Sequence, residues 1–132
     1  MNPRQFLLIG GIVLALVGVL GFIGAIGPTT GESIFGSAWW FDNAENWAHL
    51  VLGVVALVLL ATPASVQKPI VALLGIVGLF FAVYNLFSTS FLGANLERPA
   101  DLILHLVVGV WALYAAFNKG AAIASAPGSA PM

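Results

Sequence analysis

Cysteine is absent from this chain of 132 residues, and charged residues make up only 7% of it. The absence of cysteine excludes disulfide bonds, thiolate metal sites and thiol redox chemistry. A formal net charge of −1, with no cluster of basic residues, argues against nucleic acid as a partner. The chain also has no glycine-rich phosphate loop, nucleophile elbow or metalloprotease motif. The sequence therefore favours a protein that is not an enzyme.

Hydrophobic residues make up 61% of the chain, and they gather in four long runs. Each run approaches the ~20 residues that a helix needs to cross roughly 30 Å of hydrocarbon. The first run is too long for a signal-peptide core, and no small-x-small cleavage site follows it, so we expect it to be retained. The prediction is an all-α polytopic membrane protein, an up-down bundle of four transmembrane helices in one domain of residues 1–120. The expected helices span residues 6–26, 44–61, 69–87 and 100–117.

The few cations predict the orientation of this bundle. If the chain crosses four times, Arg4, Lys68 and Lys119 fall on one side, and only Arg98 falls on the other. The positive-inside rule then places both termini in the cytoplasm. We expect an integral protein of a bacterial inner membrane or a photosynthetic membrane, with the lipid bilayer around its helices.

The segments outside the expected helices carry their own signals. Residues 39–41, Trp-Trp-Phe, are typical of an anchor at the level of the lipid headgroups. Pro69 and Pro99 stand where the third and fourth helices are expected to start, a position that tolerates proline. Residues 121–132 form an Ala/Ser/Pro tail without a core-forming residue after Ile123, and we expect it to be disordered on its own.

Two stretches of the chain are nearly the same. Residues 45–57 align with residues 101–113 at a constant offset (105 − 49 = 56), and both carry acid-x-x-x-His-x-x-x-Gly-x-x-Ala around the only two histidines. The likeness extends weakly to the other helices, where residues 16–21 resemble residues 73–78 at an offset of 57 (73 − 16). The chain therefore reads as a tandem repeat of a helical hairpin, related by a pseudo-two-fold axis along the membrane normal.

The two histidines are the first candidates for a functional site, because an ionisable residue inside an apolar segment is costly. On a helix, the acid, the histidine four residues later and the glycine after four more share one face. The candidate residues are thus His49 and His105, with Glu45 and Asp101 as their carboxylate partners and Asn85 completing a polar layer. In a structural interpretation, each acid hydrogen-bonds its histidine, fixes the imidazole tautomer and links helices.

A functional interpretation makes His49 and His105 axial ligands of a haem or a chlorophyll, for electron transfer or light harvesting. Glu45, Asp101 and Asn85 would then orient the rings from behind. The glycine four residues after each histidine would clear room for a flat macrocycle, although it serves close helix packing equally well.

Two other site chemistries find less support. A site of two histidines and two carboxylates for a metal ion is disfavoured, since the bundle precedent uses Glu-x-x-His at i, i+3. We therefore expect no metal. A small transporter is the third alternative, but the first and third helices supply no acid or base below Asn85, so no relay crosses the membrane.

Residues 44–53, Ala-Glu-Asn-Trp-Ala-His-Leu-Val-Leu-Gly, resemble the motif Ala-acid-Asn-Trp-x-His-Leu-x-x-Gly of a bacterial family. That family consists of small four-helix membrane proteins of unknown function. Residues 105–109 resemble the family's other His-Leu-x-x-Gly helix, and the likeness runs from Phe6 to about Phe117. The resemblance implies the same fold and singles out the two histidines, but it implies no activity.

Taken together, these patterns favour a non-enzymatic integral membrane scaffold or accessory subunit of a larger membrane complex. Its expected partners are other membrane subunits or further copies of the chain. In this first hypothesis the protein holds no cofactor; haem or chlorophyll belongs to the second.

Overall fold

The computed structural model describes residues 1–118. Lys119, Gly120 and the expected tail of residues 121–132 lie outside the described residues. The described part contains four α-helices, each of them, with α2 taken together with the turn that follows it, long and apolar enough to cross a membrane. This confirms an all-α chain with four candidate spanning helices. They are α1 (Pro3–Phe22), α2 (Asn43–Val58), α3 (Ala64–Asn85) and α4 (Ala100–Phe117).

Capping residues decide where the first two helices begin. Asn2 accepts a hydrogen bond from the Gln5 backbone N–H at 2.9 Å and donates its own N–H to Gln5 Oε1 at 3.0 Å. This capping box starts α1 at Pro3 rather than at the expected residue 6, and the helix ends at Phe22, four residues early. A second capping box, from Asp42 to Glu45, starts α2, whose last turn tightens into the 3₁₀ helix η2 (Leu59–Ala61).

The expected start of the third helix at Pro69 is wrong, because α3 begins at Ala64. The Gln67 side chain is buried and donates hydrogen bonds to the carbonyls of Leu59 and Thr62, which anchors the first turn of α3 to the end of η2. Pro69 therefore lies inside the helix, where it leaves one carbonyl of the preceding turn without its donor. Helix α3 ends at Asn85, two residues early, whereas α4 has the expected bounds.

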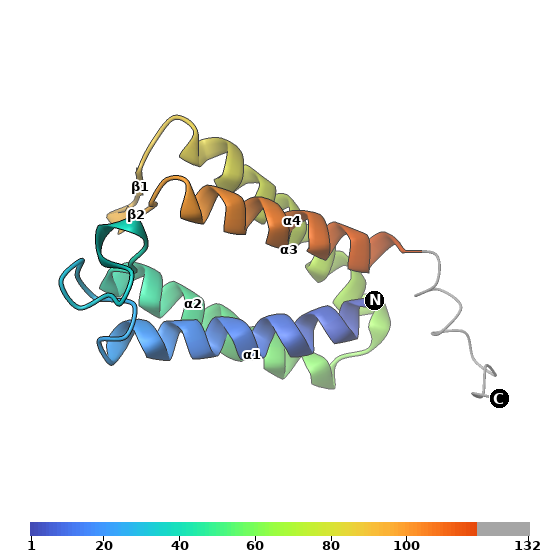
Figure 1. Cartoon of the computed structure of the whole chain (residues 1–132). Helices are drawn as coiled ribbons and strands as arrows, with labels where there is room; N and C mark the ends of the chain where they lie inside the picture. The colour runs from blue at the N-terminus through green and yellow to red at the C-terminus, as the bar shows by residue number, and fades with distance from the viewer. Residues whose placement is uncertain (119–132) are drawn as a thin grey trace.

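The four helices form two hairpins, α1 with α2 and α3 with α4, as Figure 1 shows. Each hairpin brings two helix backbones into contact at glycines. A Cβ atom added to Gly53 would collide with the backbone of Ala15 and meet the Gly11 carbonyl oxygen at 2.8 Å. A Cβ atom added to Gly109 would meet the Gly75 carbonyl oxygen at 3.0 Å. Small residues thus set the closeness of both pairs.

These contacts give the correspondence between the hairpins. Gly53 and Gly109 occupy matching positions, in agreement with the offset of 56 between α2 and α4. Their partners Gly11 and Gly75 lie further apart in sequence (75 − 11 = 64), so the expected offset of 57 between the first and third helices does not match the contacts. The difference of seven residues is about two helical turns.

The two hairpins meet each other at both ends of the bundle. One end holds the N-terminus and the last turn of α4 (Figure 1), and we call it the terminus end. There a buried apolar cluster joins all four helices. It contains Phe6, Leu7, Ala56, Val71, Ala112, Ala115 and Ala116.

The opposite end, which we call the loop end, is formed by the connections of residues 23–42 and 86–99. The first connection contains the 3₁₀ helix η1 (Gly36–Ala38), and the second contains the short antiparallel strands β1 (Ser90–Phe91) and β2 (Ala94–Asn95). Strand β2 contacts α2, so the second connection folds back onto the first hairpin.

Candidate functional site

Polar side chains are buried at the loop end, where the connections meet the first turns of α2 and α4. The exposed fraction of Glu45 is 4% and that of Asp101 is 1%. The side chains of Asn46 and Asn85 are completely buried. Buried polar groups need partners, so their hydrogen bonds define what this end of the molecule can do.

Both carboxylate oxygens of Asp101 receive a hydrogen bond. The Trp39 indole Nε1–H donates to Oδ1 at 3.0 Å, and the Glu97 backbone N–H donates to Oδ2 at 2.6 Å. Trp39 belongs to the first connection and Asp101 to the first turn of α4. The indole therefore links one hairpin to the other.

Two further hydrogen bonds make the same link. The Trp40 indole Nε1–H donates to Glu97 Oε1 at 2.8 Å, and the Asn95 backbone N–H donates to Asp42 Oδ2 at 2.7 Å. We call these three bonds, Trp39 to Asp101, Trp40 to Glu97 and Asn95 to Asp42, the clamp. Charge-assisted hydrogen bonds of this kind are stronger than neutral ones.

No local pattern in the sequence indicates the clamp, and of the expected headgroup anchor of residues 39–41 the structure contradicts Phe41. Phe41 is not at the molecular surface, as an anchor in the headgroup region would be, but is 3% exposed and stacks on His49 with 4.8 Å between ring centroids. Trp39 and Trp40 are half-buried. The sequence does show two indole N–H donors in one connection and two acids near the other. Only the folded chain decides which donor bonds to which acid.

Both histidines hydrogen-bond through the same ring nitrogen. His49 Nδ1 lies 2.7 Å from the Glu45 carbonyl oxygen, and His105 Nδ1 lies 2.8 Å from the Asp101 carbonyl oxygen. A carbonyl oxygen only accepts, so Nδ1 carries the proton and Nε2 of the neutral ring keeps a free lone pair. Within residues 1–118, neither Nε2 has a hydrogen-bond partner.

The carboxylates of Glu45 and Asp101 do not orient the histidines, contrary to expectation. Glu45 Oε2 accepts the Asp42 N–H at 3.1 Å, while the oxygens of Asp101 are engaged in the clamp and by Glu97. The backbone carbonyl of each acid orients the ring instead. The amide nitrogen of Asn85 donates to the Leu96 carbonyl at 2.9 Å and so holds the second connection rather than a histidine.

Each of the two histidines also has an aromatic neighbour. Each imidazole lies against a phenyl ring, His49 against Phe41 and His105 against Phe81, with 5.4 Å between the latter pair of centroids. Each histidine is therefore held both by a backbone carbonyl and by an aromatic ring.

In the part of the chain that the structure describes, three buried side-chain polar atoms at the loop end lack a hydrogen-bond partner. They are Oδ1 and Nδ2 of Asn46 and Oδ1 of Asn85. The side chain of Asn46 occupies the space that a Cβ atom of Gly21 would take, so this glycine gives it room between α1 and α2. No group of three or more His, Asp or Glu side chains in residues 1–118 is placed to hold a metal ion.

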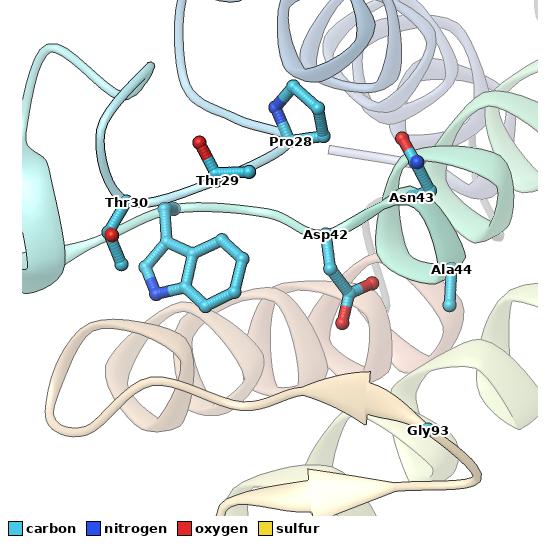
Figure 2. Close-up of a pocket in the computed structure, with 8 residues that line it drawn as sticks. Pro28, Thr29, Thr30, Asp42, Asn43, Ala44 and Gly93 are labelled. Atoms are coloured by element: carbon cyan, nitrogen blue, oxygen red, sulfur yellow. The ribbon is translucent and has the colours of Figure 1, made fainter.

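A shallow depression of about 570 Å³ opens on the surface of the loop end (Figure 2). In Figure 2, Thr29 and Thr30 line one side and Asp42, Asn43 and Ala44 the start of α2, with Gly93 in the strand turn below. Both Asp42 oxygens are already bonded, to the N–H groups of Glu45 and Asn95. Little charge is therefore left here to recognise a ligand.

A comparison of the chain with protein-family models, curated proteins and solved structures finds no match. The resemblance to the bacterial family of four-helix membrane proteins therefore stays a prediction.

Proposed function

We propose that this chain is an integral membrane protein that serves as a non-enzymatic scaffold or accessory subunit of a larger membrane complex. The proposal places it in a bacterial inner or photosynthetic membrane, with both termini in the cytoplasm. Large apolar side chains are exposed on all four helices, for example Leu16 (55%), Val54 (49%), Ile76 (59%) and Val107 (57%). Lipid and neighbouring subunits would cover this surface.

The observation that carries the scaffold proposal is the clamp. Its donors and acceptors, on residues 39–42 and 95–101, are directed at each other, so they hold two hairpins at a fixed spacing. Acids engaged in this way suit a rigid frame better than a reaction centre. We further propose that the hairpins arose by duplication, supported by the matching contacts of Gly53 and Gly109.

The accessory role is tested by native electrophoresis of the tagged chain, extracted from its own membranes in mild detergent. We expect it to migrate in a complex well above its own 13.7 kDa. Asp101→Asn, which weakens the clamp, should release part of the chain from that complex. Migration of the unaltered chain as a monomer, from membranes never exposed to harsh detergent, would contradict the proposal.

The geometry of the histidines favours a second candidate, a haem- or chlorophyll-binding membrane protein. The observation is the shared Nδ1 hydrogen bond to a backbone carbonyl, which leaves Nε2 of His49 and His105 free to ligate. A bound tetrapyrrole would supply electron-transfer or light-absorbing chemistry. The chain's own contribution would be to hold both rings in a fixed tautomer, beside Phe41 and Phe81.

An absorption spectrum of the gently purified protein separates the two candidates. Under the second candidate, His49→Leu and His105→Leu each remove or shift a visible band. Under the first, the spectrum is flat above 300 nm and the same variants only lower the thermal stability in detergent. A visible band that survives both substitutions would contradict the ligand role of these histidines.

A further inference from the structure

An apolar groove of about 350 Å³ lies at the terminus end, between the first half of α3 and the last turn of α4. Several of its side chains are widely exposed, with exposed fractions of 57% for Leu73, 59% for Ile76 and 64% for Phe117. The α3 residues of the groove span two helical turns, roughly 12 Å along the axis. The lining residues are Lys68, Pro69, Ala72, Leu73, Ile76 and Phe117.

One charge stands at the mouth of this apolar groove. Lys68 is exposed, and its Nζ lies 5.7 Å from the centroid of the Phe117 ring. Within residues 1–118, Lys68 has no carboxylate partner, because all five acids of the chain belong to the loop end. Asp101, for example, precedes Phe117 by 16 residues of α4, roughly 24 Å along the axis. The acids are Glu32, Asp42, Glu45, Glu97 and Asp101.

We infer that this groove binds an anionic phospholipid. The acyl chain lies along Ala72, Leu73 and Ile76, and the phosphate meets the ammonium group of Lys68. The inference rests on the proposal that the helices span a membrane, which puts Lys68, in the second turn of α3, near the headgroups. A cation without a local acid attracts a lipid of net negative charge more than a zwitterionic one, whose own ammonium it repels.

The charge distribution of the described chain singles out this groove for the lipid. Arg4, the other described cationic side chain of the terminus end, already donates to the Leu60 carbonyl at 2.6 Å. Arg98, the cationic side chain of the loop end, donates to the Leu86 carbonyl and follows Glu97 directly in the sequence. Of the cationic side chains in residues 1–118, only Lys68 combines an ammonium group without a hydrogen-bond or carboxylate partner, lying over the Phe117 ring, with an apolar groove beside it.

The test starts from the purified protein in nanodiscs or micelles of phosphatidylcholine. Phosphatidylglycerol and phosphatidylcholine with the same acyl chains are then added in increasing amounts. Native mass spectrometry counts the bound lipid. We expect Lys68→Gln to weaken phosphatidylglycerol binding about fivefold and to leave phosphatidylcholine binding unchanged. Arg98→Gln is the matched control at the other end and should change neither. Equal loss in the two variants, or no loss in Lys68→Gln, would overturn the inference.

Two further measurements distinguish a whole bound lipid from a bound phosphate group. Ala72→Phe fills the groove and should weaken binding of both lipids, with circular dichroism confirming that the helices remain. Glycerol phosphate, the headgroup chemistry without acyl chains, should not compete; competition at equal concentration would make this a phosphate site and overturn the lipid assignment. Release of the protein from membranes by an alkaline wash would contradict the membrane proposal itself, whereas retention with equal lipid affinities contradicts only the groove.

Discussion

The Trp39 indole and the Asp101 carboxylate lie 62 positions apart in sequence and 3.0 Å apart in space. Trp39→Phe keeps an aromatic ring but removes the N–H, which leaves one oxygen of a 1% exposed carboxylate without this donor. We expect a loss of about 1.5–3 kcal/mol in the free energy of unfolding. The measurement is the thermal or denaturant midpoint of the helical circular dichroism in detergent.

Trp47→Phe is the control for this substitution. Trp47 is 59% exposed and packs its ring on Phe22 without a hydrogen bond from its indole, so the change should cost less than about 0.5 kcal/mol. Equal destabilisation by the two substitutions would mean that ring packing, not the hydrogen bond to Asp101, stabilises the loop end.

Single residues were predictable where they stand out in the sequence, and not where their partner is distant. Ionisable residues are rare in apolar helices, so the sequence alone singles out His49, His105 and their acids. The hydrogen bonds of the histidines differ from the prediction. A spacing of i, i+4 permits a bond either to the side chain of the acid or to its backbone carbonyl. In both repeats the carbonyl is the acceptor. The pairing of Trp39 with Asp101 depends on the path of a whole connection.

At the scale of the helix pair, glycine determines how closely the backbones approach. Gly53→Ala forces a methyl group against the backbone of Ala15, and Gly109→Ala forces one against Gly75 and Leu79. We expect each substitution to lower the free energy of unfolding by about 1–3 kcal/mol. The methyl group would meet backbone atoms, which cannot give way unless a whole helix shifts. Thermal unfolding in detergent measures both.

Gly10→Ala is the matched control within α1. A Cβ atom there would meet only the Phe6 ring at 3.9 Å, an ordinary contact, and alanine favours the helical backbone. This variant should be neutral or more stable by about 0.5–1 kcal/mol. If Gly10→Ala destabilises as much as Gly53→Ala, the glycines act through something other than helix contact.

The existence of the helices was predictable from the sequence, and their ends were less so. The lengths of the hydrophobic runs predicted all four helices, and α4 has the expected bounds. The start of α3 was missed because proline is favoured in the first turn of a helix. Nothing in the local sequence shows that Gln67 anchors a first turn that begins before Pro69. The register of α1 against α3 was missed because α1 carries glycines seven residues apart, at Gly11 and Gly18. The sequence match places Gly75 opposite Gly18, whereas the helix contacts make it equivalent to Gly11, two turns away.

At the scale of the whole molecule, the two hairpins are joined at their ends by different means. An apolar cluster around Leu7 and Val71 holds the terminus end, while hydrogen bonds of the clamp hold the loop end. The charges divide likewise, since every acid of the chain belongs to the loop end. Among the described cationic side chains, Arg4 and Lys68 lie at the terminus end and only Arg98 lies at the loop end. This asymmetry of the cations is the physical basis for proposing that the terminus end faces the cytoplasm.

The absence of cysteine makes that orientation directly measurable, because an introduced thiol is the only one in the chain. Thr30 lies in the connection of the loop end and Ser65 at the terminus end, and both are exposed. In right-side-out vesicles, a membrane-impermeant maleimide should label Thr30→Cys at once and Ser65→Cys only after detergent is added. The reverse pattern would invert the orientation, and immediate labelling of both positions would mean that the hairpins do not span the membrane. Four crossings with both termini inside require that the two positions differ, since one passage of the chain through the bilayer separates them.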